Sequence, residues 1–219
     1  MAKPKITLYV DIVSPFAYLG FYALQNFPVF KQCEITYIPI FLGGLMKACG
    51  NTAPINVKNK DKWINLERAR WCRQFNVPIS ENAPPGFPIN TILIQRTLTA
   101  LSVSHPDLIP AAIAALYQAF WVEFDHPEKP ENLLRILSAA VGEAAATEAV
   151  EKSGSKEVKD GLMKRTEESF AEGAFGLPWF IVTNSKGETE SFWGFDHLGQ
   201  VVDHLGLAKP TDGGWKAML

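Results

Sequence analysis

The sequence predicts an α/β fold in which two small β-containing halves are separated by a long helical insertion. Strand patterns lie near both ends of the chain, whereas the stretch from about 43 to 170 is mostly helical. The 219 residues are enough to build one fold that carries an insertion of this size. No internal repeat and no low-complexity tract points to a different architecture.

The N-terminal half predicts a β-α-β unit. "KITLYVDI" (5–12) and "CEITYIPIF" (33–41) are rich in β-branched and aromatic residues, which favour strands. A helix is expected between them from Pro15 to about Phe27, because Ser14 is a favoured N-cap and proline suits the first helical position. A connection through a helix implies that the two strands are parallel.

The middle of the chain predicts several helices that are interrupted by prolines. The breaks "VPISENAPPGFP" (77–88), "HPDLIP" (105–110) and "HPEKP" (126–130) are places where helices must stop. The clearest helical segments are "KDKWINLERARWCRQF" (60–75), "INTILIQRTLTALSV" (89–103), "PAAIAALYQAFWVEF" (110–124) and "PENLLRILSAAV" (130–141).

The C-terminal half predicts a β-β-α unit. "PWFIVTN" (178–184) and "ETESFWG" (188–194) are strands joined by a hairpin turn, and "DHLGQVVDHLG" (196–206) is a short amphipathic helix with a glycine stop. This order of elements is that of a thioredoxin-like fold with an all-helical domain inserted between its two halves. We expect residues 1–45 and 170–219 to form the thioredoxin-like domain and residues 46–169 the helical domain.

Ser14 stands where a thioredoxin carries its first redox cysteine. The four residues there read "SPFA", so Ser14 and Ala17 replace both sulfurs and dithiol chemistry is excluded at this position. The serine has a structural interpretation as a helix cap. It also has a functional one, because a helix N-terminus concentrates positive potential and can stabilise an anion.

Composition limits the partners and the compartment. The net charge of −2 and pI near 6.1 give no basic field for nucleic acid, and no apolar run reaches the length of a membrane span, which is about 18 to 20 residues. The start "MAKPKITLYVD" lacks a signal-peptide core, so we expect an intracellular protein, with cytoplasm, mitochondrion and peroxisome all left open. The widely spaced Cys33, Cys49 and Cys72 predict free thiols, and the four histidines show no metal-ligand spacing.

Five motifs together resemble the kappa-class glutathione transferases and the related 2-hydroxychromene-2-carboxylate isomerases, over nearly the whole chain. They are "SPFAYLGFYAL", "GGLMKACGNTAP", "KNKDKW", "GAFGLPWFIV" and "FWGFDHLGQVVDHLG". The resemblance implies a homodimer that uses glutathione as its thiol substrate or cofactor. It implies no metal, and a small hydrophobic electrophile as the second substrate.

The resemblance also implies roles for residues around the sulfur. Ser14 matches the serine that hydrogen-bonds the glutathione sulfur, and Phe16 stands where tyrosine is common. Pro178 is expected to be the cis-proline of the fold, which leaves the backbone of Leu177 to pair with the cysteinyl part of the tripeptide.

The remaining implied contacts are polar. Asn51 and Lys60 match contacts to the glutathione backbone and carboxylate, and Asp196 matches the carboxylate that receives the γ-glutamyl amino group. Phe195 replaces a serine that is frequent in the family, so only its backbone N–H can bind the γ-glutamyl carboxylate. Trp63 and Trp193 are expected to lie in the core.

Three functions are consistent with the sequence. A transferase that conjugates glutathione is favoured by "GGLMKACGN", whereas "FPINT" (87–91) and "FWGFDHL" (192–198) are also typical of an isomerase that returns glutathione unchanged. A non-catalytic protein that binds glutathione or another thiol peptide is the third, because Phe16, Ala17 and Phe195 lack polar groups.

Overall fold

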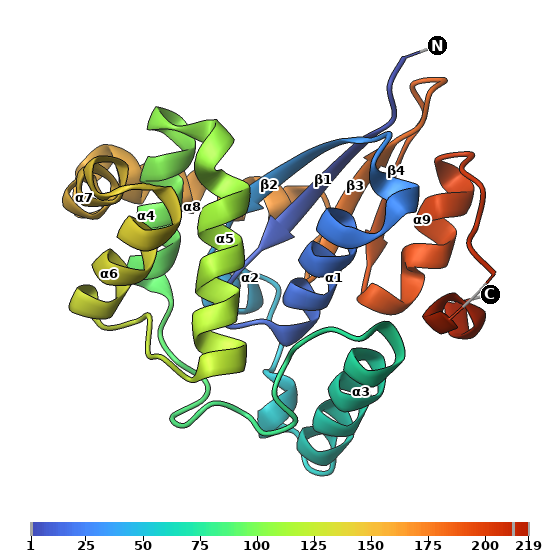
Figure 1. Ribbon diagram of the computed structural model, residues 1–219, viewed down its shortest axis with the longest axis horizontal. Coiled ribbons are helices and arrows are strands. Elements are labelled where there is room, and N and C mark those ends of the chain that lie inside the picture. Colours follow the sequence, from blue (N-terminus) through green and yellow to red (C-terminus); the bar gives the residue numbers. More distant parts are fainter. Residues whose placement is uncertain (1, 212, 219) are drawn as a thin grey trace.

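The computed structural model describes residues 2–211 and 213–218, and it contains one four-stranded sheet in the order β2-β1-β3-β4. β1 runs parallel to β2 and antiparallel to β3, and β3 runs antiparallel to β4 (Figure 1). The strands are β1 (Lys5–Val10), β2 (Glu34–Pro39), β3 (Trp179–Thr183) and β4 (Thr189–Trp193). The parallel β-α-β half and the antiparallel β-β-α half are confirmed, and together they form one mixed sheet.

Two helices of the thioredoxin-like part cover one face of this sheet. They are α1 (Pro15–Asn26) and α9 (Leu198–His204). Gly20 of α1 packs so closely on the sheet that an added Cβ would lie 3.1 Å from the ring of Phe180 and 3.3 Å from Pro178. The start of β3 therefore lies directly against α1.

All of the helices α2 to α8 lie between β2 and β3 in the chain, so the inserted helical segment is confirmed. They are α2 (Leu42–Ala48), α3 (Lys60–Phe75), α4 (Ile92–Ser104), α5 (Ile109–Gln118), α6 (Pro130–Val141), α7 (Glu143–Lys152) and α8 (Lys156–Ala171). The helix predicted at 110–124 ends differently, because α5 passes into a π-helical turn, η4 (Ala119–Glu123), which stops at Phe124 with a positive φ of 59°.

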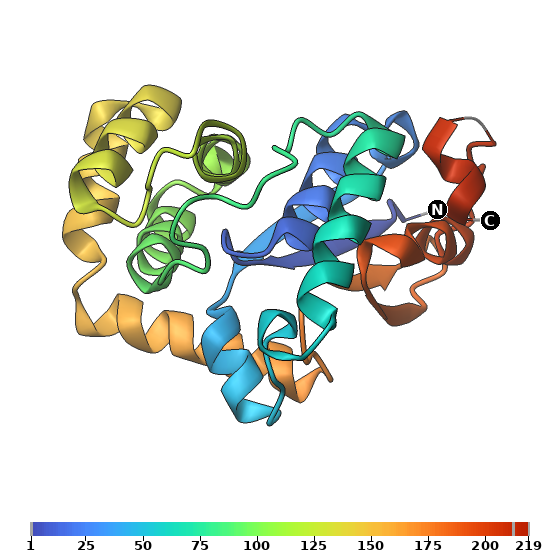
Figure 2. The same ribbon diagram turned by 90° about the horizontal axis from the view of Figure 1, so that it is seen from below.

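The insertion is divided between two places in the molecule. Helices α4 to α8 form a group beside the sheet, whereas α3 lies against α1 (Figure 2). Phe75 of α3 packs against Phe27, Phe195 and Trp215, with ring centroids 5.2 to 6.0 Å apart. The thioredoxin-like part thus shares its core with one inserted helix, and the boundaries at residues 45/46 and 169/170 stay predictions.

The expectation that both tryptophans lie in the core was wrong. Trp63 is 53% exposed and Trp193 is 46% exposed. Trp63 lies on the outer side of α3, where the guanidinium of Arg70 covers its ring at 5.2 Å, and Trp193 ends the edge strand β4. Within the described parts of the chain, no helix has the length and apolar character that crossing a membrane requires.

Candidate functional site

Ser14 is the N-cap of α1 and is almost buried. Its backbone is extended, and its Oγ accepts a hydrogen bond from the Ala17 N–H at 3.1 Å. The residue is only 6% exposed. Because the capping bond uses the oxygen as acceptor, the hydroxyl hydrogen remains available to donate to an anion at the helix start. The structural interpretation of Ser14 is confirmed, and it is compatible with the functional one.

The turn between β1 and α1 is fixed by Asp11, which the sequence analysis did not single out. Asp11 is fully buried, and its carboxylate accepts hydrogen bonds from the N–H groups of Val13 and Leu42 and from the Gln95 amide. Burial raises the pKa of Asp11, and these hydrogen bonds oppose part of that shift. The only sequence signal was one carboxylate inside an apolar run, "YVDIVSP".

The peptide bond between Leu177 and Pro178 is cis, as predicted. Pro178 packs near Gly20 of α1, and its carbonyl accepts the Gly194 N–H at 3.1 Å. Within 2–211 and 213–218, the N–H and C=O of Leu177 take part in no backbone hydrogen bond of a turn or loop. Pairing of these two groups with the backbone of a ligand stays a prediction.

Asn51 holds the loop that precedes Leu177. Its Nδ2 donates to the Phe175 carbonyl at 2.9 Å, and its Oδ1 accepts the Thr52 N–H at 2.8 Å. One amide hydrogen of Asn51 remains for a ligand. The structure thus brings Asn51 next to the Leu177 segment, although the two are far apart in the sequence.

Lys60 is the first residue of α3 and is exposed. No hydrogen bond or ion pair joins it to another predicted site residue in the part of the chain that the structure describes. Its place beside Asn51 in a ligand site stays a prediction.

Phe195 and Asp196 have opposite environments. Phe195 is 1% exposed, with its ring packed 5.5 Å from Trp71 and 5.3 Å from Phe75, so its side chain belongs to the core. Asp196 is exposed, with Oδ1 3.4 Å from His197 Nδ1.

The helix predicted from 196 starts instead as a 3-10 turn, η5 (Phe195–His197). Gly194 precedes it with φ +94°, and a Cβ there would collide with the Asp196 carboxylate.

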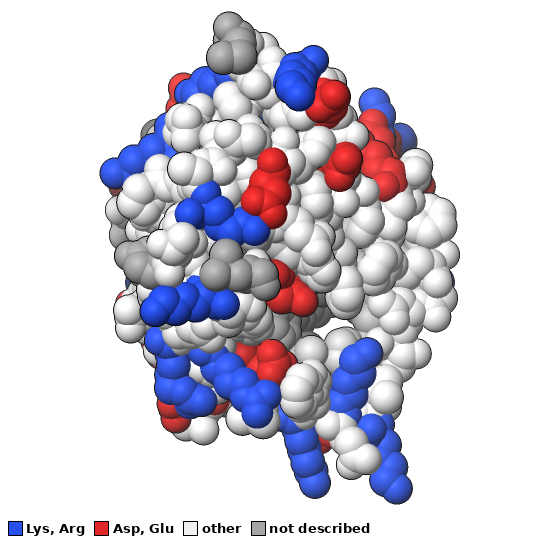
Figure 3. Space-filling view, turned by 90° about the vertical axis from the view of Figure 1, so that its right-hand side faces the viewer, with Lys and Arg blue, Asp and Glu red and all other residues white. Residues whose placement is uncertain are grey.

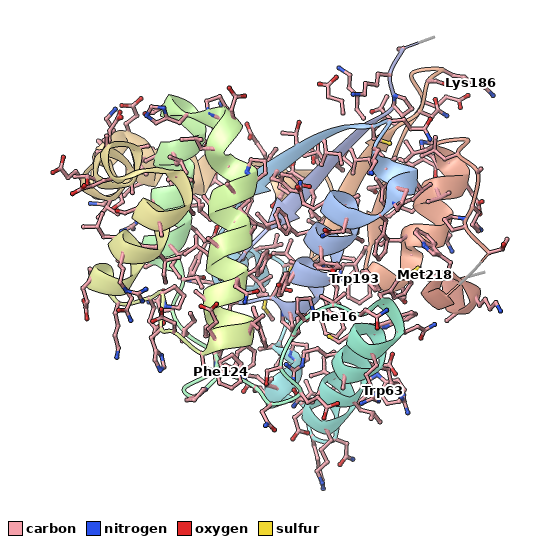
Figure 4. The ribbon with its side chains drawn as sticks, viewed as in Figure 1. Phe16, Trp63, Phe124, Lys186, Trp193 and Met218 are labelled. Atoms are coloured by element: carbon pink, nitrogen blue, oxygen red, sulfur yellow. The ribbon has the colours of Figure 1, made fainter. Side chains whose placement is uncertain are left out.

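Phe16 lies at the foot of α1, above α3, and is half-buried against the core (Figure 4). The neighbouring face, which carries β4 and α9, has charges of both signs. Acidic side chains lie on one side of a hollow near its centre, and Lys and Arg side chains gather toward the foot of the molecule (Figure 3).

Among the described residues, two cavities lie away from these positions. One of about 460 Å³ lies between α1 and α5, and one of about 420 Å³ lies between α2, α4 and α8. Neither is lined by a residue that the sequence predicts to bind glutathione. The described residues contain no group of three or more His, Cys, Asp and Glu arranged to hold a metal.

The three cysteines are free thiols, as predicted. Cys33 and Cys72 are buried, and burial raises the pKa of both, that of Cys72 to about 11. Ala17, at the second redox position, is fully buried as well. The site therefore holds a hydroxyl where a thioredoxin has a thiol pair.

Comparison with known families places the fold. Residues 5–206 match the family described as "DSBA-like thioredoxin domain". The chain belongs to this DsbA-like family. Its α/β fold is shared by the solved structure of 2-hydroxychromene-2-carboxylate isomerase, which superposes with a TM-score of 0.74 at 22% identity and covers 92% of this chain and 94% of that one.

Two curated proteins are similar over nearly the whole length. "Glutathione S-transferase kappa 1" of Caenorhabditis elegans is 27% identical over 214 residues, which is 94% of this chain and 93% of that protein. The protein of the same name from Rattus norvegicus is 28% identical over 211 residues, which is 94% of this chain and 92% of that protein. The resemblance predicted from the sequence motifs is confirmed.

Proposed function

We propose that the protein is a kappa-class glutathione transferase. It binds glutathione as the thiolate beside Ser14, and this thiolate attacks a small hydrophobic electrophile by addition or substitution. The observation that carries the proposal is the Ser14 hydroxyl at the start of α1, whose oxygen is already bonded to Ala17 N–H and whose hydrogen is free to donate to sulfur. Similarity to kappa transferases over more than nine-tenths of the chain supports it.

The energies suffice without a general base. A free thiol with a pKa of about 8.5 is only a few per cent ionised near neutrality. Lowering that pKa by two units requires about 2.7 kcal/mol. A hydrogen bond to a charged group supplies about 1.5–3 kcal/mol, and a helix N-terminus supplies about 0.3–2 kcal/mol. Ser14 and the start of α1 together are enough.

The tripeptide is proposed to lie along the Leu177 segment. The free N–H and C=O of Leu177 pair with the cysteinyl unit of glutathione, which directs its sulfur toward Ser14. Asn51, which already holds the adjacent loop through Phe175, donates its remaining amide hydrogen to the glutathione backbone. Lys60 binds the glycine carboxylate.

The γ-glutamyl end of glutathione is proposed to lie near η5. The exposed Asp196 carboxylate receives the ammonium group, and the Phe195 N–H donates to the carboxylate. Because the Phe195 side chain is buried, this end has one polar contact fewer than a serine would give.

We propose a homodimer as the assembly, which analytical ultracentrifugation at several protein concentrations would test.

Product analysis tests the proposed reaction. The protein is incubated with glutathione and 1-chloro-2,4-dinitrobenzene, and the expected product is the glutathione conjugate with release of chloride. In a parallel incubation with glutathione and 2-hydroxychromene-2-carboxylate, recovery of all glutathione together with the isomerised product would instead indicate an isomerase. Binding of glutathione in a calorimeter without either product would refute both enzymes and leave a binding protein.

A further inference from the structure

Asp11 is a buried carboxylate that the proposed reaction does not use. It lies in the turn that connects β1 to Ser14 and is 0% exposed. Oδ2 accepts the Leu42 N–H at the start of α2 at 2.8 Å, and Oδ1 accepts the Gln95 amide of α4 at 2.9 Å and the Val13 N–H at 3.2 Å. One side chain therefore joins the turn to two inserted helices.

The backbone of the same turn is held from the insertion as well. The Asp11 carbonyl accepts the Ser14 N–H at 3.0 Å and the Tyr117 hydroxyl at 3.3 Å, and the Ile12 carbonyl accepts Trp121 Nε1 at 2.8 Å. Gln95, Tyr117 and Trp121 are all at most 1% exposed. Such buried bonds are costly to break, so the turn has little freedom to shift.

We propose that Asp11 is a positioning residue that fixes the Ser14 hydroxyl relative to the bound sulfur and makes the inserted helices part of the thiolate site. The inference rests on the proposed function. Hydrogen bonds weaken steeply with distance and angle, and a displacement of about 1 Å at a reacting group can cost about 100-fold in rate. The Ser14 N–H donates to the Asp11 carbonyl, so the serine and the carboxylate that anchors the turn belong to one hydrogen-bonded unit.

Two substitutions disturb Asp11 to different extents. Asp11→Ala removes the bonds to Leu42, Val13 and Gln95 together with the side-chain hydrogen bond to Thr91. Asp11→Asn retains the acceptor for Leu42, and its new amide hydrogen can bond Gln95 Oε1, a buried atom that has no partner in the described residues, after a flip of the Gln95 amide. Asparagine therefore loses mainly the Val13 bond and serves as the conservative variant.

The test is a double-mutant cycle with Ser14→Ala. Turnover of the test electrophile at saturating glutathione and the thiol pKa of bound glutathione are measured with and without the serine hydroxyl in each background. We expect Ser14→Ala to cost about 10- to 1000-fold in the wild type, the range that loss of one donor typically causes, and under about threefold in Asp11→Ala. In the Asp11→Asn background, the loss caused by Ser14→Ala, here called the Ser14 effect, should be most of that seen in the wild type. Each Ser14→Ala comparison is made between two proteins with the same residue at position 11. Any direct effect of the Asp11 charge on turnover or on the thiol pKa therefore cancels.

A buried core truncation away from the turn is the control. Val182→Ala in β3 removes fully buried apolar atoms, and the full Ser14 effect should persist in that background.

Equal Ser14 effects in the wild type and in Asp11→Ala would overturn the positioning role. If Asp11→Ala does not fold, the cycle is run with Gln95→Leu, where an undiminished Ser14 effect overturns the role of the insertion. A wild type with neither turnover nor a lowered thiol pKa overturns the proposed function itself, and the inference with it.

Discussion

Ser14→Ala should raise the thiol pKa of bound glutathione toward its free value. The substitution removes the hydroxyl hydrogen proposed to donate to sulfur and leaves α1 in place. A hydrogen bond to a charged group contributes about 1.5–3 kcal/mol, and one pKa unit corresponds to about 1.4 kcal/mol. The pKa should therefore rise by about one to two units, and the remaining depression measures the helix start and its N–H groups.

Ultraviolet difference titration of the complex measures this pKa, because the thiolate absorbs and the thiol does not. Ser155→Ala is the matched control, since Ser155 caps α8 in the same way, with Oγ accepting the Val158 N–H at 3.2 Å. Each substitution should lower stability by about 1 kcal/mol, which corresponds to about 2–4 °C in Tm for a chain of this size. Only Ser14→Ala should change the thiol pKa. A change below about 0.3 units, or the same change in both variants, would leave capping as the only role of Ser14.

Three further predictions concern thiols and pH. The protein should not reduce insulin disulfides by a dithiol cycle, and reduction that survives replacement of Cys33, Cys49 and Cys72 would contradict the site as described. Titration with a thiol reagent at pH 8 should modify the partly exposed Cys49 first, because burial raises the pKa of the other two cysteines; equal rates for all three would contradict it. The Lys152 hydrogen bond lowers the pKa of Glu148 from 4.5 to about 2, so the stability that this carboxylate contributes is present above pH 4.5 and lost as pH falls toward 2. Thermal melts should separate Glu148→Gln from the wild type at pH 7 and not at pH 2.

Local patterns were enough to predict the sheet and the start of the site. Alternating and β-branched residues marked all four strands, and the serine–proline pair located the start of α1 at Pro15. The cis bond before Pro178 followed from resemblance to the family, since nothing in a short sequence window distinguishes the two isomers. Predictions of this kind succeed because the deciding interactions lie within a few residues of one another.

Long-range contacts explain what the sequence could not predict. The Asp11 carboxylate bonds to groups 31 and 84 residues away, so its role is visible only after folding. Trp193 was expected in the core, but it ends an edge strand and is half exposed. Phe195, two residues later, is buried. Its burial depends on α3, which belongs to the insertion and packs onto the thioredoxin-like part.

The Ser14 geometry also explains how a site with serine in place of a redox cysteine can still use a reactive sulfur, one that a ligand supplies. A hydroxyl accepts one hydrogen bond and donates another at the same time, so the atom that caps α1 can also stabilise a sulfur anion supplied by a ligand. No histidine or lysine is bonded to Ser14 Oγ in the described residues, and a hydroxyl with no base beside it is a poor nucleophile. The chain therefore supplies the donor and the helix start, and the nucleophile has to arrive with the substrate. Because Ala17 stands at the second redox position, no resolving thiol follows Ser14 in the helix, and a thiolate held at this position is not part of a dithiol cycle.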